Sequence, residues 1–311
     1  MTEPSPAAGG LVRVYPADAA ATRPTAALVW VHGGGFAAGD LDMPEAHWVA
    51  RTLAARGLTV VSVDYRLVGD GCRYPAPSDD VIAAWRWMLE HADELGIDPT
   101  RAALGGASAG ANLAAGSVLR ILARTTMPTG AIIDFAGGAP APGATPEVAQ
   151  ETRAPSAKPD APPAGVFLAY PTLLAVQPAP DAALRALLDA NPGSDRFGPD
   201  VVLAMYEGYL GGPVDDAPLP AVPGLAAASD VAGFPPVLLV NSEADELRVS
   251  GEVFATTLVE AGVPVELVTE PGTQHGHLNR PDEPAASATL DRVVRWLATL
   301  TADSITEGSI P

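Results

Sequence analysis

Short apolar runs alternate with longer segments of helical periodicity along most of this chain. The runs at 27–31, 58–63, 102–104, 166–170, 237–240 and 263–269 predict buried strands. Segments 44–56, 79–95, 109–122, 251–261 and 283–300 repeat apolar residues at helical spacing and predict helices. Because strands and helices alternate in this way, the pattern favours an α/β fold, with a mainly parallel central sheet and helices on both faces.

Two stretches interrupt the alternation. Residues 125–163 are rich in alanine, glycine and proline, and residues 171–235 carry two helix-like pieces, at 182–188 and 199–210, among further prolines. We find no internal repeat. The two stretches are therefore expected to be excursions from the sheet rather than parts of it.

Composition and charge exclude several classes of protein. Apolar residues make up 48% of the 311 residues, which is ample for a core and excludes wholesale disorder. The net charge of −19 excludes a general electrostatic grip on nucleic acid or on an anionic membrane. The single cysteine, Cys72, allows no intrachain disulfide, and no Cys/His spacing resembles a zinc site. No apolar run is long enough for a signal peptide or a membrane span, so a soluble, cytoplasmic protein is expected.

The strongest local signal for chemistry is Gly106-Ala107-Ser108-Ala109-Gly110. It follows a predicted strand and opens a predicted helix, which is the setting of a nucleophilic serine on a tight strand–helix turn. The flanking glycines leave room for neighbouring elements, and the helix N-terminus favours negative charge beside Ser108. The plainer alternative is a glycine-rich helix start in which Ser108 is a capping residue.

A second glycine-rich segment, His32-Gly33-Gly34-Gly35-Phe36, follows the first strong strand. Three consecutive glycines can present backbone N–H groups where negative charge develops on the oxygen of an acyl group. The alternatives are a flexible loop and a phosphate-binding loop. The phosphate reading is weak because the P-loop pattern is absent and no lysine lies near.

A nucleophilic serine needs a general base and an acid that orients the base. Asp245 follows the strand at 237–240 and His275 follows the strand at 263–269, in the chain order that α/β-hydrolases use. Glu243 and Glu246 remain alternatives for the acid. His277 remains the alternative base.

Several further motifs occur in a fixed order along the chain, and together they resemble one family. They are Gly39-Asp40 after the glycine loop, Asp64-Tyr65-Arg66-Leu67, Tyr74-Pro75-Ala76, Gly96-Ile97-Asp98-Pro99, the segment 106–113, Asp245-Glu246-Leu247 and His275-Gly276. The set resembles the bacterial hormone-sensitive-lipase-like esterases of the α/β-hydrolase superfamily. The similarity covers most of the chain.

The resemblance implies a function and a set of roles. Ser108 would be the nucleophile, His275 the general base and acid, and Asp245 its orienting partner. The oxyanion donors would be the N–H groups of Gly34, Gly35 and Ala109, with Gly33 as a further candidate. Such enzymes need no cofactor, and the expected substrate is a small, fairly hydrophobic ester. The alternative functions are an amidase, a deacetylase or formamidase, and a non-catalytic ligand-binding protein. The chain could form a homodimer.

The resemblance also predicts an organisation. Residues 1–311 would form one catalytic domain, with an insertion at 125–163 and a cap-like excursion at 171–235. The cap is expected to be reduced, because the glycine loop begins at residue 32, whereas relatives carry a longer N-terminal section that supplies cap helices.

Overall fold

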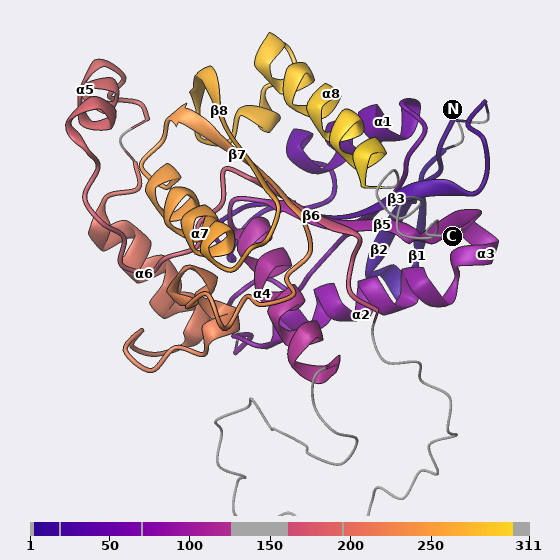
Figure 1. The fold of residues 1–311 in the computed structure, drawn as a ribbon, viewed down its shortest axis with the longest axis horizontal. Coiled ribbons are helices and arrows are strands. Elements are labelled where there is room, and N and C mark those ends of the chain that lie inside the picture. The colour runs from indigo at the N-terminus through magenta and orange to yellow at the C-terminus, as the bar shows by residue number, and fades with distance from the viewer. Residues whose placement is uncertain (1–2, 19, 70, 126–160, 195, 301–311) are drawn as a thin grey trace, which may run out of the picture.

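A computed structural model describes residues 3–18, 20–69, 71–125, 161–194 and 196–300 of the chain (Figure 1). Nearly all of the predicted insertion at 125–163 lies outside these residues. The centre of the fold is an eight-stranded sheet in the order β1-β2-β4-β3-β5-β6-β7-β8. Its strands are β1 (Ser5–Ala7), β2 (Val12–Tyr15), β3 (Thr25–Val31), β4 (Thr59–Val63), β5 (Ile97–Ala107), β6 (Gly165–Ala169), β7 (Val237–Ala244) and β8 (Val265–Gln274).

Strands β3 to β8 pair in parallel, and β1 and β2 add an antiparallel edge. The predicted mainly parallel sheet is therefore confirmed. The antiparallel edge was not predicted, although Val12 and Val14 alternate with Arg13 and are both buried. Four residues are too short a period-two pattern to identify a strand without its partner, β4.

Helices cover both faces of the sheet, as the alternating pattern predicted (Figure 1). On one face, α1 (Pro44–Ala55) and α8 (Pro284–Thr299) pack on alternate strand residues such as Leu28 and Trp30. On the other, α2 (Ala76–Glu90), α4 (Ala109–Thr125) and α7 (Arg248–Glu260) pack on the intervening residues, such as Val29. The helix predicted at 79–95 is interrupted at His91, and its last turn is the separate helix α3 (Ala92–Leu95).

The excursion between β6 and β7 carries α5 (Ala182–Ala190) and α6 (Pro199–Leu210), which extend to one end of the molecule (Figure 1). The 3-10 turns Leu219–Ala221 and Pro223–Leu225 follow, and the second of these packs on α7. Residues 3–18 and 20–24 contain no α-helix. In the described part of the chain, no helix combines the length and apolar character needed to cross a bilayer.

Candidate active site

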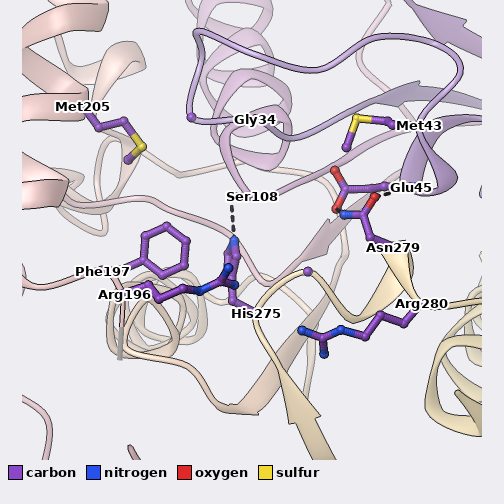
Figure 2. Close-up of a pocket in the computed structure, with 12 residues that line it drawn as sticks. Gly34, Met43, Glu45, Ser108, Arg196, Phe197, Met205, His275, Asn279 and Arg280 are labelled. Carbon is purple, nitrogen blue, oxygen red and sulfur yellow. Dashed lines mark hydrogen bonds between the residues drawn. The ribbon is translucent and has the colours of Figure 1, made fainter. Parts of the chain in front are cut away.

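The carboxyl ends of three parallel strands bring the predicted catalytic residues together. Ser108 directly follows β5, Asp245 directly follows β7, and His275 directly follows β8. His275 Nε2 lies 2.9 Å from Ser108 Oγ, and His275 Nδ1 lies 2.7 Å from Asp245 Oδ2. Figure 2 shows the hydrogen bond between Ser108 and His275, which both line one cavity. Parallel strands end at the same edge of a sheet, which is why residues 167 positions apart can meet.

Ser108 sits on a strained turn. Its φ of 53° lies in the left-handed region, which non-glycine residues occupy at a cost. The turn is tight because α4 starts immediately after it. A Cβ on Gly106 would collide with the backbone of Gly110, and a Cβ on Gly110 would collide with the carbonyl oxygens of Val31 and His32. The two glycines of the motif therefore allow helix and strand to approach closely enough to expose the serine.

The structure separates Asp245 from the other two candidate acids. Asp245 is fully buried, and its other oxygen, Oδ1, accepts the Leu247 N–H at 3.0 Å. Glu243 instead accepts the Gly272 N–H at 2.8 Å, and Glu246 accepts the Phe197 N–H at 2.6 Å. The carboxylate that accepts the hydrogen bond from His275 is thus that of Asp245 rather than that of either glutamate.

His277, the alternative base, belongs to a different set of contacts. Its Nδ1 lies 2.9 Å from Ser242 Oγ and its Nε2 lies 3.0 Å from Thr289 Oγ1, and the side chain is fully buried. Burial, together with the nearby His275 and Arg280, lowers the pKa of His277 from 6.5 to about 3. Both ring nitrogens are occupied by hydroxyl groups, so His277 supports the fold rather than facing Ser108.

This buried histidine predicts an acid sensitivity of the fold. Its pKa is lower in the folded state than in the unfolded state, so the unfolded chain binds the additional proton and stability falls with pH below about 6.5. We expect this group to remove about 2 kcal/mol of the free energy of unfolding between pH 7 and pH 5. Urea unfolding of wild type and His277→Gln at both pH values checks it. Parallel losses in the two proteins would exclude His277 as the source.

The glycine loop after β3 is held by its carbonyl groups. The Gly33 oxygen lies 2.7 Å from His32 Nδ1, and the Gly34 oxygen accepts the N–H groups of Ala37 and Ala38. In a trans peptide the N–H points opposite to the carbonyl, so the N–H groups of Gly34 and Gly35 point away from these bonds. Gly34 and Gly35 line the same cavity as Ser108. Neither N–H donates to any acceptor within the described ranges.

Gly33 differs from its neighbours, and the difference reveals a residue that the sequence did not single out. The Gly33 N–H donates to the Glu45 carboxylate at 2.6 Å, so it is not free to bind a substrate oxygen. Glu45 lies in the first turn of α1, is 2% exposed, and lines the cavity (Figure 2). A glutamate at the start of a helix is the ordinary partner of the helix dipole, so its sequence position carries no signal for a site.

The cavity at Ser108 has a volume of about 400 Å³. Apolar side chains from three segments line it: Met43 before α1, Phe197 before α6, and Met205 within α6. Arg196 and Arg280 add guanidinium groups on the side of His275 (Figure 2). The excursion between β6 and β7 therefore supplies part of the wall of the cavity.

The same excursion also supports the glycine loop. The ring of Phe36, at the end of the loop, stacks on Tyr209 with centroids 4.0 Å apart and meets Tyr206 edge-on at 5.6 Å. Tyr206 accepts a hydrogen bond from Asn112 Nδ2 at 2.9 Å, which links α6 to the helix behind Ser108. Tyr206 and Tyr209 are thus packing residues between α6 and the body of the molecule. The described residues contain no group of three or more His, Cys, Asp or Glu side chains that could hold a metal ion.

Comparison with known proteins agrees with the fold. A family profile described as the alpha/beta hydrolase fold matches residues 28–279, and the chain belongs to this family, in its hormone-sensitive-lipase-like branch. It is 37% identical over 256 residues to the carboxylesterase NlhH of Mycobacterium tuberculosis, an alignment that covers 81% of this chain and 66% of that protein. It is 30% identical over 260 residues to an ethyl acetate hydrolase of Pseudomonas putida, covering 80% of this chain and 65% of the relative.

Solved structures extend the similarity to nearly the whole chain. The esterase LipW from Mycobacterium marinum superposes with a TM-score of 0.70 at 28% identity, covering 96% of this chain and 80% of that one. The two curated relatives are longer, and the chain spans just under two thirds of their length. The comparisons therefore establish the family and its fold.

Proposed function

We propose that this protein is a serine carboxylesterase that hydrolyses small, short-acyl esters through a covalent acyl-enzyme. One observation carries the proposal: the hydrogen-bonded series Ser108–His275–Asp245 opens into a cavity that Gly34 and Gly35 also line. Nucleophile, base, orienting acid and oxyanion donors are the complete set that acyl transfer to a serine requires. The named activities of the curated relatives support the same class of reaction.

Each residue has a defined step in the proposed reaction. Ser108 Oγ attacks the ester carbonyl carbon while His275 Nε2 takes the hydroxyl proton. The charge that develops on the carbonyl oxygen is bound by the N–H groups of Gly34, Gly35 and Ala109. His275 then returns the proton to the departing alcohol, which leaves an acyl group on Ser108. Water, activated by the same histidine, attacks this acyl-enzyme and releases the acid.

Asp245 holds His275 in the tautomer and orientation in which it can act as a base. Its carboxylate accepts the Nδ1–H of His275, which leaves Nε2 free to accept the serine proton. The same contact stabilises the imidazolium that forms during the attack. Asp245 is fully buried, so its contact with His275 is shielded from water.

The lining of the cavity supports the choice of substrate. A volume of about 400 Å³ is at the small end of ligand pockets. Met43, Phe197 and Met205 offer apolar contacts for a short acyl or alcohol group. One of the relatives is named an ethyl acetate hydrolase, and ethyl acetate is a small ester that would fit a cavity of this volume.

A panel of aryl esters and matched anilides tests the proposal. We expect kcat/KM to be highest for acetyl and butyryl esters and to fall for decanoyl esters, because the longer chain exceeds the cavity. The anilides should be much slower, and a fluorophosphonate should modify Ser108 alone, as read by peptide mass spectrometry. Faster turnover of the anilides would assign the protein as an amidase. Absence of both turnover and labelling would contradict a serine hydrolase altogether.

A further inference from the structure

We propose that Glu45 is a positioning residue. It fixes the glycine loop, which carries the oxyanion donors, relative to the loop that carries the general base His275. The inference rests on the proposed function, because it concerns how the same site is assembled. It goes beyond that function by assigning a role to a buried carboxylate that takes no part in the proton transfers described above.

The Glu45 carboxylate accepts three hydrogen bonds from three different loops. Oε1 accepts the Gly33 N–H at 2.6 Å, from the loop after β3. Oε2 accepts the Tyr170 hydroxyl at 2.5 Å, from the residue after β6, and Asn279 Nδ2 at 3.0 Å, from the segment after His275. Figure 2 shows Glu45 and Asn279 side by side at the wall of the cavity. One side chain therefore connects the ends of three strands.

The hydrogen bond between Glu45 and the Gly33 N–H orients the oxyanion donors. Anchoring the Gly33 N–H fixes the peptide that enters the glycine loop, and the bonds to the Gly33 and Gly34 carbonyls fix the next two peptides. The N–H groups of Gly34 and Gly35 then have one allowed direction. Donors aimed in advance at the developing charge need no reorganisation during the reaction, which is the origin of their catalytic effect.

The hydrogen bonds from Asn279 and Tyr170 to Glu45 help to position the base, His275. The pairing of Glu45 with Asn279 is reciprocal, because Asn279 Oδ1 accepts the backbone N–H of Glu45 at 3.1 Å. Asn279 lies four residues after His275, so this pair ties the base loop to the start of α1. The Tyr170 ring meets the His275 ring edge-on with centroids 5.1 Å apart. Burial and the adjacent Glu45 raise the pKa of Tyr170 well above its usual value, so its hydroxyl remains a donor.

The arrangement requires a carboxylate of this length. All three groups that face Glu45 are donors, and a carboxylate is a pure acceptor. A glutamine has one oxygen and one NH₂ group, so one orientation sets its NH₂ against the Gly33 N–H and the other sets it against the Asn279 amide. Asn279 cannot turn its amide to compensate without losing the Glu45 N–H. An aspartate keeps the charge but is shorter by one methylene group.

The test compares Glu45→Gln with Glu270→Gln. Glu270 is a matched control: it is a buried glutamate on β8, 8% exposed, outside the cavity. The kinetics of an acetyl aryl ester are normalised to active sites counted by fluorophosphonate. Inhibition by a trifluoromethyl ketone, whose adduct with a serine carries an oxyanion, reports the donors directly.

We expect Glu45→Gln to keep close to one reactive serine per chain and to lower kcat by about 10²-fold, the cost of misplacing an oxyanion donor. KM should change by less than about threefold, because the substrate itself is bound by the apolar lining. The inhibition constant of the ketone should rise in parallel with the loss of kcat. Glu270→Gln should leave kcat and the inhibition constant within about twofold of wild type.

Two results would overturn the proposal. One is a Glu45→Gln enzyme with unchanged kcat per reactive serine. The other is a loss of kcat with unchanged affinity for the ketone, which would separate Glu45 from the oxyanion donors. Glu45→Asp keeps the negative charge but shortens the side chain. Its kcat should fall as much as that of Glu45→Gln, because the shorter carboxylate cannot reach all three donors. Failure of the proposed function itself would look different, because wild type would then show no ester turnover and no modified serine.

Discussion

Replacing Ser108 with alanine is expected to lower kcat for an aryl acetate by about 10⁶-fold, because it removes the proposed nucleophile that forms the acyl-enzyme. The hydroxyl that is lost lies 2.9 Å from His275 Nε2. It belongs to a residue with a strained backbone, whose turn exposes the side chain to the cavity. The residual rate would come from substrate binding and from the oxyanion donors. The measurement is kcat per mole of purified protein, and a fluorophosphonate should no longer modify the variant.

Ser117→Ala is the matched control for this change. Ser117 lies in the same helix, α4, is fully buried, and contacts Ser78 Oγ at 3.3 Å rather than any residue of the site. Its loss should reduce stability slightly and leave kcat per active site unaltered. A Ser108→Ala protein that still hydrolyses the ester at the wild-type rate would remove Ser108 from the mechanism.

Asp245→Asn is expected to lower kcat by about 10⁴-fold while the protein remains folded. An asparagine is nearly the same size, but it can present an N–H to His275 Nδ1, which favours the tautomer with its proton on Nε2. That tautomer cannot accept the proton of Ser108. The imidazolium formed in the transition state also loses its charged partner. The expected signature is a large fall in kcat with a small change in KM, measured on an acetyl aryl ester.

Glu243→Gln serves as the control for the acid. Glu243 lies two residues before Asp245 and binds the Gly272 N–H instead of His275. It should retain kcat within a few-fold of wild type. If Glu243→Gln were as damaging as Asp245→Asn, the acid would be assigned to the wrong residue of the segment.

Much of the site could be predicted because its signals are local. The turn at Ser108 needs small residues on both sides of the serine, and the collisions at Gly106 and Gly110 show the reason in three dimensions. Ser108, Asp245 and His275 each follow a strand of the parallel sheet, and such strands end at the same edge, which brings the three residues together. Periodicity and glycine spacing are properties of neighbouring residues, so one sequence displays them.

Other features depended on contacts between distant segments. The sequence left Glu243, Glu246 and His277 as alternatives because all lie within two residues of the chosen acid or base. Their partners, such as the Phe197 N–H and the Thr289 hydroxyl, decide among them. The strands β1 and β2 were missed for the same reason, since β2 is completed by pairing with β4, and β1 by pairing with β2.

The amino-acid pattern was enough to predict the α/β alternation, the serine turn, the glycine loop, and a candidate acid and base after the last two strands. The tertiary structure alone decided which N–H groups of that loop are free and which carboxylate holds the loop in place. Glu45 is separated from Gly33 by 12 residues, from Tyr170 by 125 and from Asn279 by 234. No periodic or local pattern can encode a hydrogen-bond network across such separations, because its members become neighbours only when the sheet brings its strand ends to one edge.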